Sequence, residues 1–157
     1  MFQIEPIGYV RNTRSQLLDD DWDRVPARIE LVESLPPEAL EGLEEFSHAE
    51  IIYQFHRVAD SAIERGARHP RGNPHWPRVG IFAQRAKDRP NRIGATIVEI
   101  KRRQGRVLEV AGLDAIDGTP VLDIKPVMAE FLPRTPVRQP DWSHELMQNY
   151  WNASGGS

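Results

Sequence analysis

Short strand-like segments separated by turn-forming residues restrict the fold of this chain more than any other feature of its sequence. These segments have strand length and are rich in β-branched residues, and turn signals such as Gly105 and the pair Asp117 and Gly118 stand between them. Long segments with the 3.6-residue period of a helix do not alternate with them. The pattern predicts an antiparallel barrel or sandwich. The expected strands cover residues 4–10, 28–32, 51–55, 79–83, 95–100, 107–110 and 121–124.

Two short helices are expected outside these strands. Ser34 precedes the segment P-P-E-A-L at 36–40 in the arrangement of a helix cap and first turn. Residues 143–151 are expected to form a terminal helix that carries Tyr150. The stretch 67–77 contains prolines and a glycine that break regular structure, so we expect a long surface loop there, where binding residues often lie.

The length of 157 residues suits a single domain, because folding at this size removes roughly two thirds of the unfolded chain's surface from water. We expect a barrel domain over residues 1–135 and a C-terminal extension over 136–157 with a short helix and a flexible tail. The longest apolar runs are too short to span a bilayer, and the first residues lack the pattern of a secretion signal. We therefore expect a cytoplasmic protein that makes no membrane contact.

The net charge of −3 hides an uneven distribution along the chain. Residues 1–56 carry 4 basic and 12 acidic side chains, residues 57–106 carry 13 and 4, and residues 107–157 carry 3 and 7. The basic middle segment, 57–106, can attract a polyanion. Equally, it can pair with the acidic segments on either side, since separation along a sequence does not imply separation in space.

Several common functional motifs are absent from the sequence. No G-x-G-x-x-G follows a strand, and neither a P-loop nor H-E-x-x-H occurs, which removes the usual glycine-rich nucleotide loops and the zinc-protease pattern. The chain has no cysteine, and its five histidines lack the spacing of zinc ligands. We therefore expect no disulfide, no cysteine nucleophile and no metal site.

Five ordered sequence blocks carry the functional information. They read P-I-G-Y-V-R at 6–11, G-L-E-E-F-S-H at 42–48, R-V-G-I-F-A-Q-R at 78–85, R-P-N-R-I-G at 89–94 and G-L-D-A-I-D-G-T-P-V-L-D-I-K-P at 112–126. In this order they resemble the signature blocks of the TrmO family, also called TsaA or YaeB-like. Any one block would be weak evidence, whereas five in order are specific.

The resemblance implies a fold, an activity and an assembly. Members of the family are small antiparallel β-barrels that form homodimers and bind S-adenosylmethionine near the subunit interface. Characterised members methylate the exocyclic nitrogen of threonylcarbamoyladenosine beside the anticodon of tRNA. We therefore expect an all-β barrel of about six to seven strands with short peripheral helices, an S-adenosylmethionine cofactor, a tRNA substrate and a homodimer.

The resemblance also implies which residues contact the cofactor. Asp114 can accept hydrogen bonds from a ribose or from the methionine ammonium group, Gly112 allows a ligand to approach the backbone, and Arg85 can hold a carboxylate. The set that carries over consists of Arg57, Val58, Arg85, Ala95, Ala111, Gly112, Leu113 and Asp114.

Many residues of these blocks also have a purely structural interpretation. Asp114 and Asp117 are of a type common at turns, and Asp117 with Gly118 would on its own predict a hairpin turn. Arg85 and Arg89 would, taken alone, form a solvated basic edge. The apolar residues of the same blocks are more typical of a core than of a cofactor pocket; these are Phe82, Ile93 and Leu113.

Three departures from the family pattern concern binding. The loop 19–23 reads D-D-D-W-D where relatives have P-R-Q-P-G-L. An acidic loop with an indole can attract a sulfonium cation, which makes Asp21 and Trp22 candidate cofactor contacts. The structural alternative is a solvated loop tip, which is the more common case for such a sequence. In the segment 83–94, charged residues replace an aromatic residue and a proline. Longer relatives add a C-terminal domain that engages tRNA, and the basic middle segment can compensate. The candidate substrate contacts are Lys87, Arg89, Asn91 and Arg92.

The leading hypothesis is methyl transfer from a sulfonium to a nucleophilic nitrogen by in-line displacement. In such a reaction the protein mainly aligns nitrogen, methyl group and sulfur. The sequence identifies no catalytic residue; a base for the nitrogen proton would help, and Asp114 is only a candidate. Two alternatives stay open: a methyltransferase of a small molecule or another RNA, and a module that senses S-adenosylmethionine without turnover.

Overall fold

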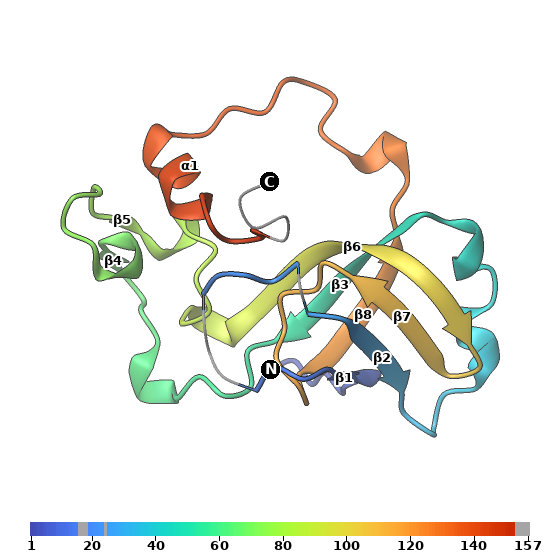
Figure 1. Cartoon of the computed structure of the whole chain (residues 1–157). Coiled ribbons are helices and arrows are strands. Elements are labelled where there is room, and N and C mark those ends of the chain that lie inside the picture. Colours follow the sequence, from blue (N-terminus) through green and yellow to red (C-terminus); the bar gives the residue numbers. More distant parts are fainter. Residues whose placement is uncertain (16–18, 24, 153–157) are drawn as a thin grey trace.

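Six antiparallel strands close into a barrel in the computed structural model, which describes residues 1–15, 19–23 and 25–152 (Figure 1). The strand order is β1–β2–β7–β6–β3–β8, and pairing of β8 with β1 closes the barrel. The predicted all-β barrel is thus confirmed. The strands are β1 (Gly8–Arg11), β2 (Ala27–Leu31), β3 (His48–Gln54), β6 (Ile93–Gln104), β7 (Val107–Ala111) and β8 (Pro120–Pro126).

The barrel core follows from the alternation of apolar and polar residues along the strands. In β2 the side chains of Ala27, Ile29 and Leu31 are buried and that of Arg28 is exposed, because successive side chains of a strand point to opposite faces. Each fully buried Val, Ile or Leu side chain contributes roughly 1.5 to 3 kcal/mol to the stability. The other buried core residues are Val10, Leu40, Ala49, Ile51, Tyr53, Val98, Leu108, Val110, Leu113, Ala115 and Val121.

One irregularity in the barrel wall lies beside Tyr53. The register between β3 and β8 shifts between Ile52 and Tyr53, and such bulges bend a strand and are common at barrel rims. Across the β3–β6 pair, Tyr53 faces Gly94, and a Cβ atom on Gly94 would lie 2.6 Å from Cζ of the tyrosine. Glycine at this position therefore leaves the space that the tyrosine ring occupies.

The expected strands at residues 4–10 and 79–83 are partly or wholly wrong. Strand β1 begins at Gly8 rather than at residue 4, because Gly8 pairs with Leu31, where the neighbouring β2 ends. The segment 79–83 is not a barrel strand. Val79–Gly80 forms β5, which pairs with β4 (Ala67–Arg68) in a separate two-stranded sheet, and the backbone then turns into the 3₁₀ helix η5 (Ile81–Ala83). The expected loop 67–77 therefore contains β4 and a second 3₁₀ turn, η4 (Pro70–Gly72).

The helices are shorter than expected. The first is the 3₁₀ helix η1 (Pro37–Leu40); its N-cap is Pro36, so the prediction that Ser34 caps it is wrong. Near the C-terminus, α1 (Asp141–Met147) ends before Tyr150, which lies in the turn that follows. The remaining 3₁₀ turns are η2 (Leu43–Glu45), η3 (Asp60–Ala62), η6 (Pro90–Arg92) and η7 (Ala129–Phe131).

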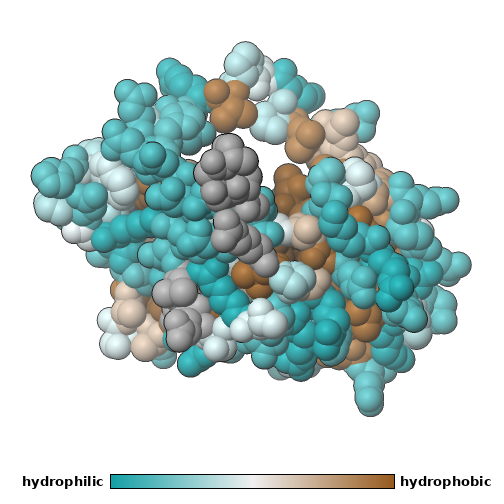
Figure 2. Space-filling view, in the orientation of Figure 1, coloured by the Kyte–Doolittle hydropathy of each residue, from teal (hydrophilic) through white to brown (hydrophobic). Residues whose placement is uncertain are grey.

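The chain leaves the barrel after β8 and returns to it. Residues 128–140 form an exposed arc, and α1 then lies beside the β4–β5 sheet (Figure 1). Figure 2 shows that this face of the molecule is mostly hydrophilic, with hydrophobic residues visible beside the arc. Within the described parts of the chain, no helix has the length and apolar character needed to cross a membrane.

Candidate functional site

The carboxylate of Asp114 is the centre of a cluster of hydroxyl groups. Tyr53 Oη donates a hydrogen bond to Oδ1 of Asp114 at 2.9 Å, and Thr96 Oγ1 donates to the same oxygen. Tyr150 Oη donates to the other oxygen, Oδ2. The donors come from β3, β6 and the C-terminal segment, and Asp114 itself lies in the connection from β7 to β8. Distant parts of the sequence therefore meet at this single carboxylate.

Strand pairing explains why Tyr53 and Thr96 reach the same oxygen. In the β3–β6 pair, Thr96 faces Ile51 and Gly94 faces Tyr53. Tyr53 and Thr96 are therefore diagonal neighbours on adjacent strands, with side chains on the same face of the sheet. Both side chains are buried. A buried hydroxyl needs a hydrogen-bond partner, which the carboxylate of Asp114 supplies to both. The hydroxyl oxygens of Tyr53 and Thr96 also lie 3.3 Å from each other.

Both tyrosines remain protonated hydrogen-bond donors. Burial raises the pKa of Tyr53 well above its usual value, and the negative charge of Asp114 raises it further. The same two causes, in the same order, raise the pKa of Tyr150. The positive charge of Arg85 acts on both groups in the opposite direction. Arg85 is therefore a cation that acts on both tyrosines from nearby.

Arg85 is held at the barrel wall. Its Nη2 atom donates a hydrogen bond to the carbonyl oxygen of Ala95 in β6 at 2.5 Å. The preceding residue, Gln84, is buried and its amide donates to the carbonyl oxygens of Arg68 and Val79 at 3.2 and 3.1 Å. These bonds tie the end of η5 to the β4–β5 sheet. The structure thus brings together Arg85, Ala95 and Asp114, three of the predicted cofactor contacts.

The segment 111–114 passes close to the acidic loop 19–23. Gly112 has a φ of +83°, a conformation that favours glycine, and a Cβ atom on it would lie 3.7 Å from Oδ1 of Asp23. Leu113, beside it, is fully buried in the core. Its expected core position is therefore confirmed, while the neighbouring Gly112 leaves the backbone accessible to an adjacent group.

The loop residues Asp21 and Trp22 are fixed by protein contacts. Trp22 is only 4% exposed, and the guanidinium of Arg14 lies 3.9 Å from its ring centroid. Asp21 accepts a hydrogen bond from Nδ2 of Asn152 at 3.2 Å. The cation that faces the indole in the structure is thus Arg14, and we keep the cofactor role of the two residues as a prediction.

Arg57 and Val58 make their contacts with other parts of the chain. Arg57 donates to the carbonyl oxygen of Ser15 at 2.8 Å. Val58 is buried, and its carbonyl oxygen accepts a hydrogen bond from Nη1 of Arg92 at 2.7 Å. Arg92 also bonds Oδ1 of Asp60 at 2.9 Å. Arg92 therefore links η6 to the segment that follows β3.

Of the other candidate substrate contacts, Arg89 lies near an exposed aromatic ring, that of Phe82. Phe82 is 75% exposed, and the guanidinium of Arg89 lies 5.9 Å from its centroid. Arg89 also donates to the carbonyl oxygen of Gln84. Lys87 Nζ lies 3.3 Å from Oδ1 of Asp19, and Asn91 adopts a φ of 66° within η6.

The core assignment of Phe82 and Ile93 is wrong. In η5 the side chain of Ile81 is buried and the backbone turns Phe82 outward. Ile93 is 38% exposed because side chains alternate between the two faces of β6. Gly94 and Thr96 take the inward positions, so Ile93 points outward. Asp117 and Gly118 form a turn, in which Gly118 has a φ of +84°, but they do not form the expected hairpin. The flanking strands β7 and β8 are not neighbours in the barrel.

Three functional candidates were missed by the sequence analysis: Tyr53, Thr96 and Tyr150. A tyrosine at an inward position of a predicted strand signals a buried hydroxyl that needs an acceptor, which applies to Tyr53. Tyr150 lies outside every motif block, and no local pattern connects it with Asp114.

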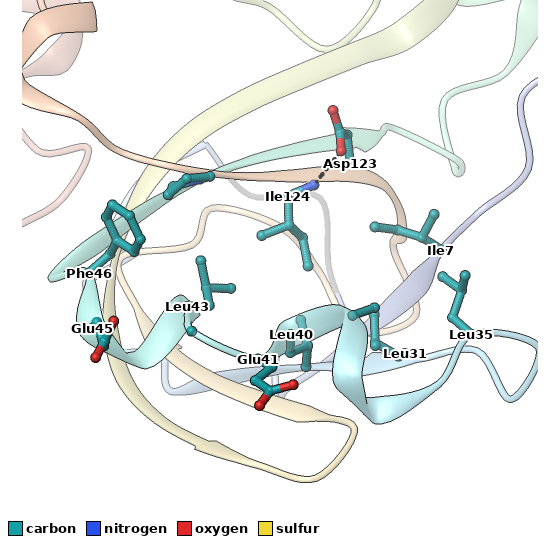
Figure 3. Close-up of a pocket in the computed structure, with 13 residues that line it drawn as sticks. Ile7, Leu31, Leu35, Leu40, Glu41, Leu43, Glu45, Phe46, Asp123 and Ile124 are labelled. Atoms are coloured by element: carbon teal, nitrogen blue, oxygen red, sulfur yellow. Dashed lines mark hydrogen bonds between the residues drawn. The ribbon is translucent and has the colours of Figure 1, made fainter.

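A separate cavity of about 490 Å³ lies between η1, η2 and β8 (Figure 3). Apolar side chains such as Ile7, Leu40 and Phe46 line it, together with the acidic residues Glu41, Glu45 and Asp123. None of the residues predicted to bind cofactor or substrate lines this cavity. Within the described residues, no group of three or more His, Asp or Glu side chains is placed to hold a metal ion.

Comparisons with known proteins agree with this architecture. Residues 19–131 match the family model of the tRNA-methyltransferase O N-terminal domain. The chain is 33% identical over 153 residues to the human tRNA (adenine(37)-N6)-methyltransferase, covering 92% of this chain and 34% of that protein. It is 38% identical over 142 residues to a Pyrococcus abyssi protein named as a probable S-adenosyl-L-methionine-binding protein, covering 88% of this chain and 74% of that protein.

The fold has a solved counterpart as well. The crystal structure of TrmO from Pseudomonas aeruginosa matches with a TM-score of 0.72 and 30% identity, covering 90% of this chain and 62% of that chain. The chain therefore spans only part of the length of these relatives. Its barrel, its sequence blocks and the match over residues 19–131 lead to one conclusion: the chain belongs to the TrmO family, as a tRNA-methyltransferase O N-terminal domain.

Proposed function

We propose that this protein binds S-adenosylmethionine beside Asp114 and transfers its methyl group to the exocyclic nitrogen of an adenosine in tRNA. The observation that carries the proposal is the anchored carboxylate of Asp114, together with the guanidinium of Arg85 bonded to Ala95, the neighbour of the Thr96 donor. The names of the human and Pyrococcus relatives support the reaction and the cofactor. The threonylcarbamoyl form of the adenosine is the specific acceptor that we propose. We also propose that the protein acts in the cytoplasm.

The residues of the site fit the chemistry of the cofactor. A carboxylate offers about four acceptor positions, and the donors recorded for the Asp114 carboxylate are the hydroxyls of Tyr53, Thr96 and Tyr150. One position on Oδ2 can therefore accept a hydrogen bond from a ribose hydroxyl or an ammonium group. Arg85 is suited to the carboxylate of the methionine part, since its guanidinium is planar and always charged.

When bound, S-adenosylmethionine supplies an electrophilic methyl group on a sulfonium centre. The chain's own residues supply orientation. Asp114 and Arg85 come from separate connecting segments and carry opposite charges, so together they define the direction of a zwitterionic ligand. Gly112, with no side chain, allows that ligand to approach the backbone. Alignment of this kind can lower a barrier by several kcal/mol, up to about 7 to 11 in favourable cases.

The proposed acceptor surface is the area around Phe82. An exposed aromatic ring next to an arginine is suited to stacking on a nucleobase, since every base has a π-face. Lys87 and Arg89 both follow Phe82 in the sequence, Arg89 lies near the ring, and both cations can contact phosphates. We therefore assign acceptor binding to Phe82, Lys87 and Arg89, and keep Asn91 and Arg92 as neighbouring candidates.

We also propose that the protein acts as a homodimer. The outer face of β6 exposes Ile93 and Ile97, and the arc exposes Phe131 and Val137. An apolar surface that these side chains form together would be suited to contact with a second copy of the chain. Light scattering at tens of micromolar should report twice the chain mass, and a monomer under these conditions would contradict this part of the proposal.

A methyl-transfer assay tests the proposed function directly. The protein is incubated at low salt with methyl-labelled S-adenosylmethionine and tRNA from a strain that lacks the modification, and the tRNA nucleosides are analysed by mass spectrometry. We expect one added methyl group on threonylcarbamoyladenosine. Cofactor binding in calorimetry without any tRNA methylation would instead favour a small-molecule methyltransferase or a sensor.

A further inference from the structure

The C-terminal residues 141–152, here called the strap, are bonded to two other parts of the protein. The backbone N–H groups of Asp21, Trp22 and Asp23 donate to the carbonyl oxygens of residues 149–151 at 3.2, 3.0 and 3.2 Å. At the other end of the strap, Nε1 of Trp76 donates to Oε2 of Glu145 at 2.8 Å. The strap therefore docks on both the acidic loop and the connection between β4 and β5.

Docking of the strap determines the position of Tyr150. The ring of Trp151 packs edge-on against the Tyr150 ring, with centroids 4.9 Å apart and an interplanar angle of 88°. The carbonyl oxygen of Tyr150 itself accepts the bond from Trp22. Backbone and ring are thus both fixed, and the hydroxyl group is aimed at Oδ2 of Asp114.

The three donors leave Asp114 little freedom. Tyr53 and Thr96 both donate to Oδ1, which fills that oxygen, whereas Oδ2 has Tyr150 as its recorded donor. A carboxylate bonded through both oxygens to fixed partners cannot rotate without breaking a bond. The remaining acceptor position on Oδ2 therefore has a defined direction, and Tyr150 is the partner that defines it.

From this arrangement we propose that Tyr150 is a positioning residue for the binding of S-adenosylmethionine, acting through Asp114. The inference rests on the proposed function. The phenol holds Oδ2 so that its free lone pair meets a hydroxyl or ammonium donor of the ligand. The strap, including α1, is in this view one wall of the cofactor site, and it connects that wall to the acidic loop 19–23.

The test is the affinity of Tyr150→Phe for S-adenosylmethionine, measured by calorimetry. The substitution keeps the ring and removes only the hydroxyl, and we expect the dissociation constant to rise roughly tenfold, as for loss of a hydrogen bond to a charged group. Tyr9→Phe is the matched control, because no hydrogen bond is recorded for the Tyr9 hydroxyl among the described residues; its affinity should equal that of wild type. An unchanged affinity in Tyr150→Phe would overturn the inference, because the hydroxyl would then have no effect on binding. A tighter affinity would also overturn it, because the strap would then compete with the ligand.

Two further measurements separate positioning from a general loss of structure. The amides of Asp21, Trp22 and Asp23 report docking of the strap, so their hydrogen-exchange protection in Tyr150→Phe should match that of wild type. In the Asp114→Asn background, Tyr150→Phe should have little additional effect on affinity, because the residue acts through the carboxylate. Loss of amide protection together with affinity, or independent effects in the double variant, would assign Tyr150 a merely structural role.

The outcome is distinguishable from failure of the proposed function. If wild-type protein does not bind S-adenosylmethionine at all, the proposed function fails and no comparison of variants is needed to see it. If wild type binds and Tyr150→Phe binds equally well, only the positioning role fails.

Discussion

Lys87 Nζ lies 3.3 Å from Oδ1 of Asp19, and Nη2 of Arg71 lies 3.0 Å from Oδ1 of the adjacent Asp20. The acidic loop thus covers two cations of the basic middle segment. Arg103 pairs with Glu44 at 3.0 Å in the same manner. The basic middle segment, 57–106, thus pairs in part with acidic segments of the chain itself. A polyanion that binds this segment must therefore compete with the protein's own carboxylates for these cations.

Removal of the competing carboxylates should strengthen binding of tRNA. In the double variant Asp19→Asn and Asp20→Asn, Lys87 and Arg71 lose their acidic partners and become available to phosphates. We expect a several-fold lower dissociation constant at low salt, and a steeper salt dependence by roughly 0.7 to 0.9 in log-log slope for each added phosphate contact.

The matched control for that experiment is Glu5→Gln with Glu33→Gln, which removes the same charge at exposed positions of the acidic N-terminal segment. Fluorescence anisotropy across a salt series measures both quantities. Equal gains in the two double variants would show that net charge, rather than the released cations, governs tRNA binding.

Loss of either charged group of the site should weaken cofactor binding. Asp114→Ala removes the acceptor and Arg85→Ala removes the cation, and each charge-assisted contact is worth about 1.5 to 3 kcal/mol, or roughly ten- to a hundredfold in affinity. Calorimetry gives the affinity. The melting temperature without ligand should stay close to wild type for Arg85→Ala, whose side chain contacts the protein mainly through Ala95. Wild-type affinity in both variants would refute the assignment of the site.

Substitution of the exposed ring should affect the acceptor alone. Phe82→Ala removes a stacking contact that is worth about 1 to 3 kcal/mol per base. We therefore expect a higher KM for tRNA, with unchanged stability and cofactor affinity, because the side chain is 75% exposed. Phe2→Ala, at an exposed ring to which no role is assigned, serves as the control. A stability loss in Phe82→Ala would mean that the ring packs against a second subunit instead.

The strand pattern predicted an antiparallel barrel or sandwich because alternation in segments such as β2 and β7 reflects burial directly, and the family resemblance pointed to the barrel. The family blocks located Asp114 and Arg85, which the fold brings close together. The sequence could not predict that Phe82 points outward, since this depends on the turn at Ile81, a backbone event without a side-chain pattern. Nor could it connect Tyr150 with Asp114, because 36 residues and an exposed arc separate them.

Acid should weaken the anchor between the β4–β5 sheet and the segment before η6. Burial raises the pKa of Asp88, but the hydrogen bonds and positive charge of Arg68 outweigh it and hold the pKa below its usual value. Above that usual value Asp88 is ionised in both states, so the pair contributes fully. As the pH falls, the unfolded state takes up the proton first, and the contribution is lost through the folded-state pKa.

At pH 7 we expect Asp88→Asn to cost roughly 1.5 to 3 kcal/mol. Urea unfolding of both proteins at pH 7, 5 and about 3 should show this difference shrinking only below the usual aspartate pKa of about 3.9, and a constant difference would exclude the ion pair as its source.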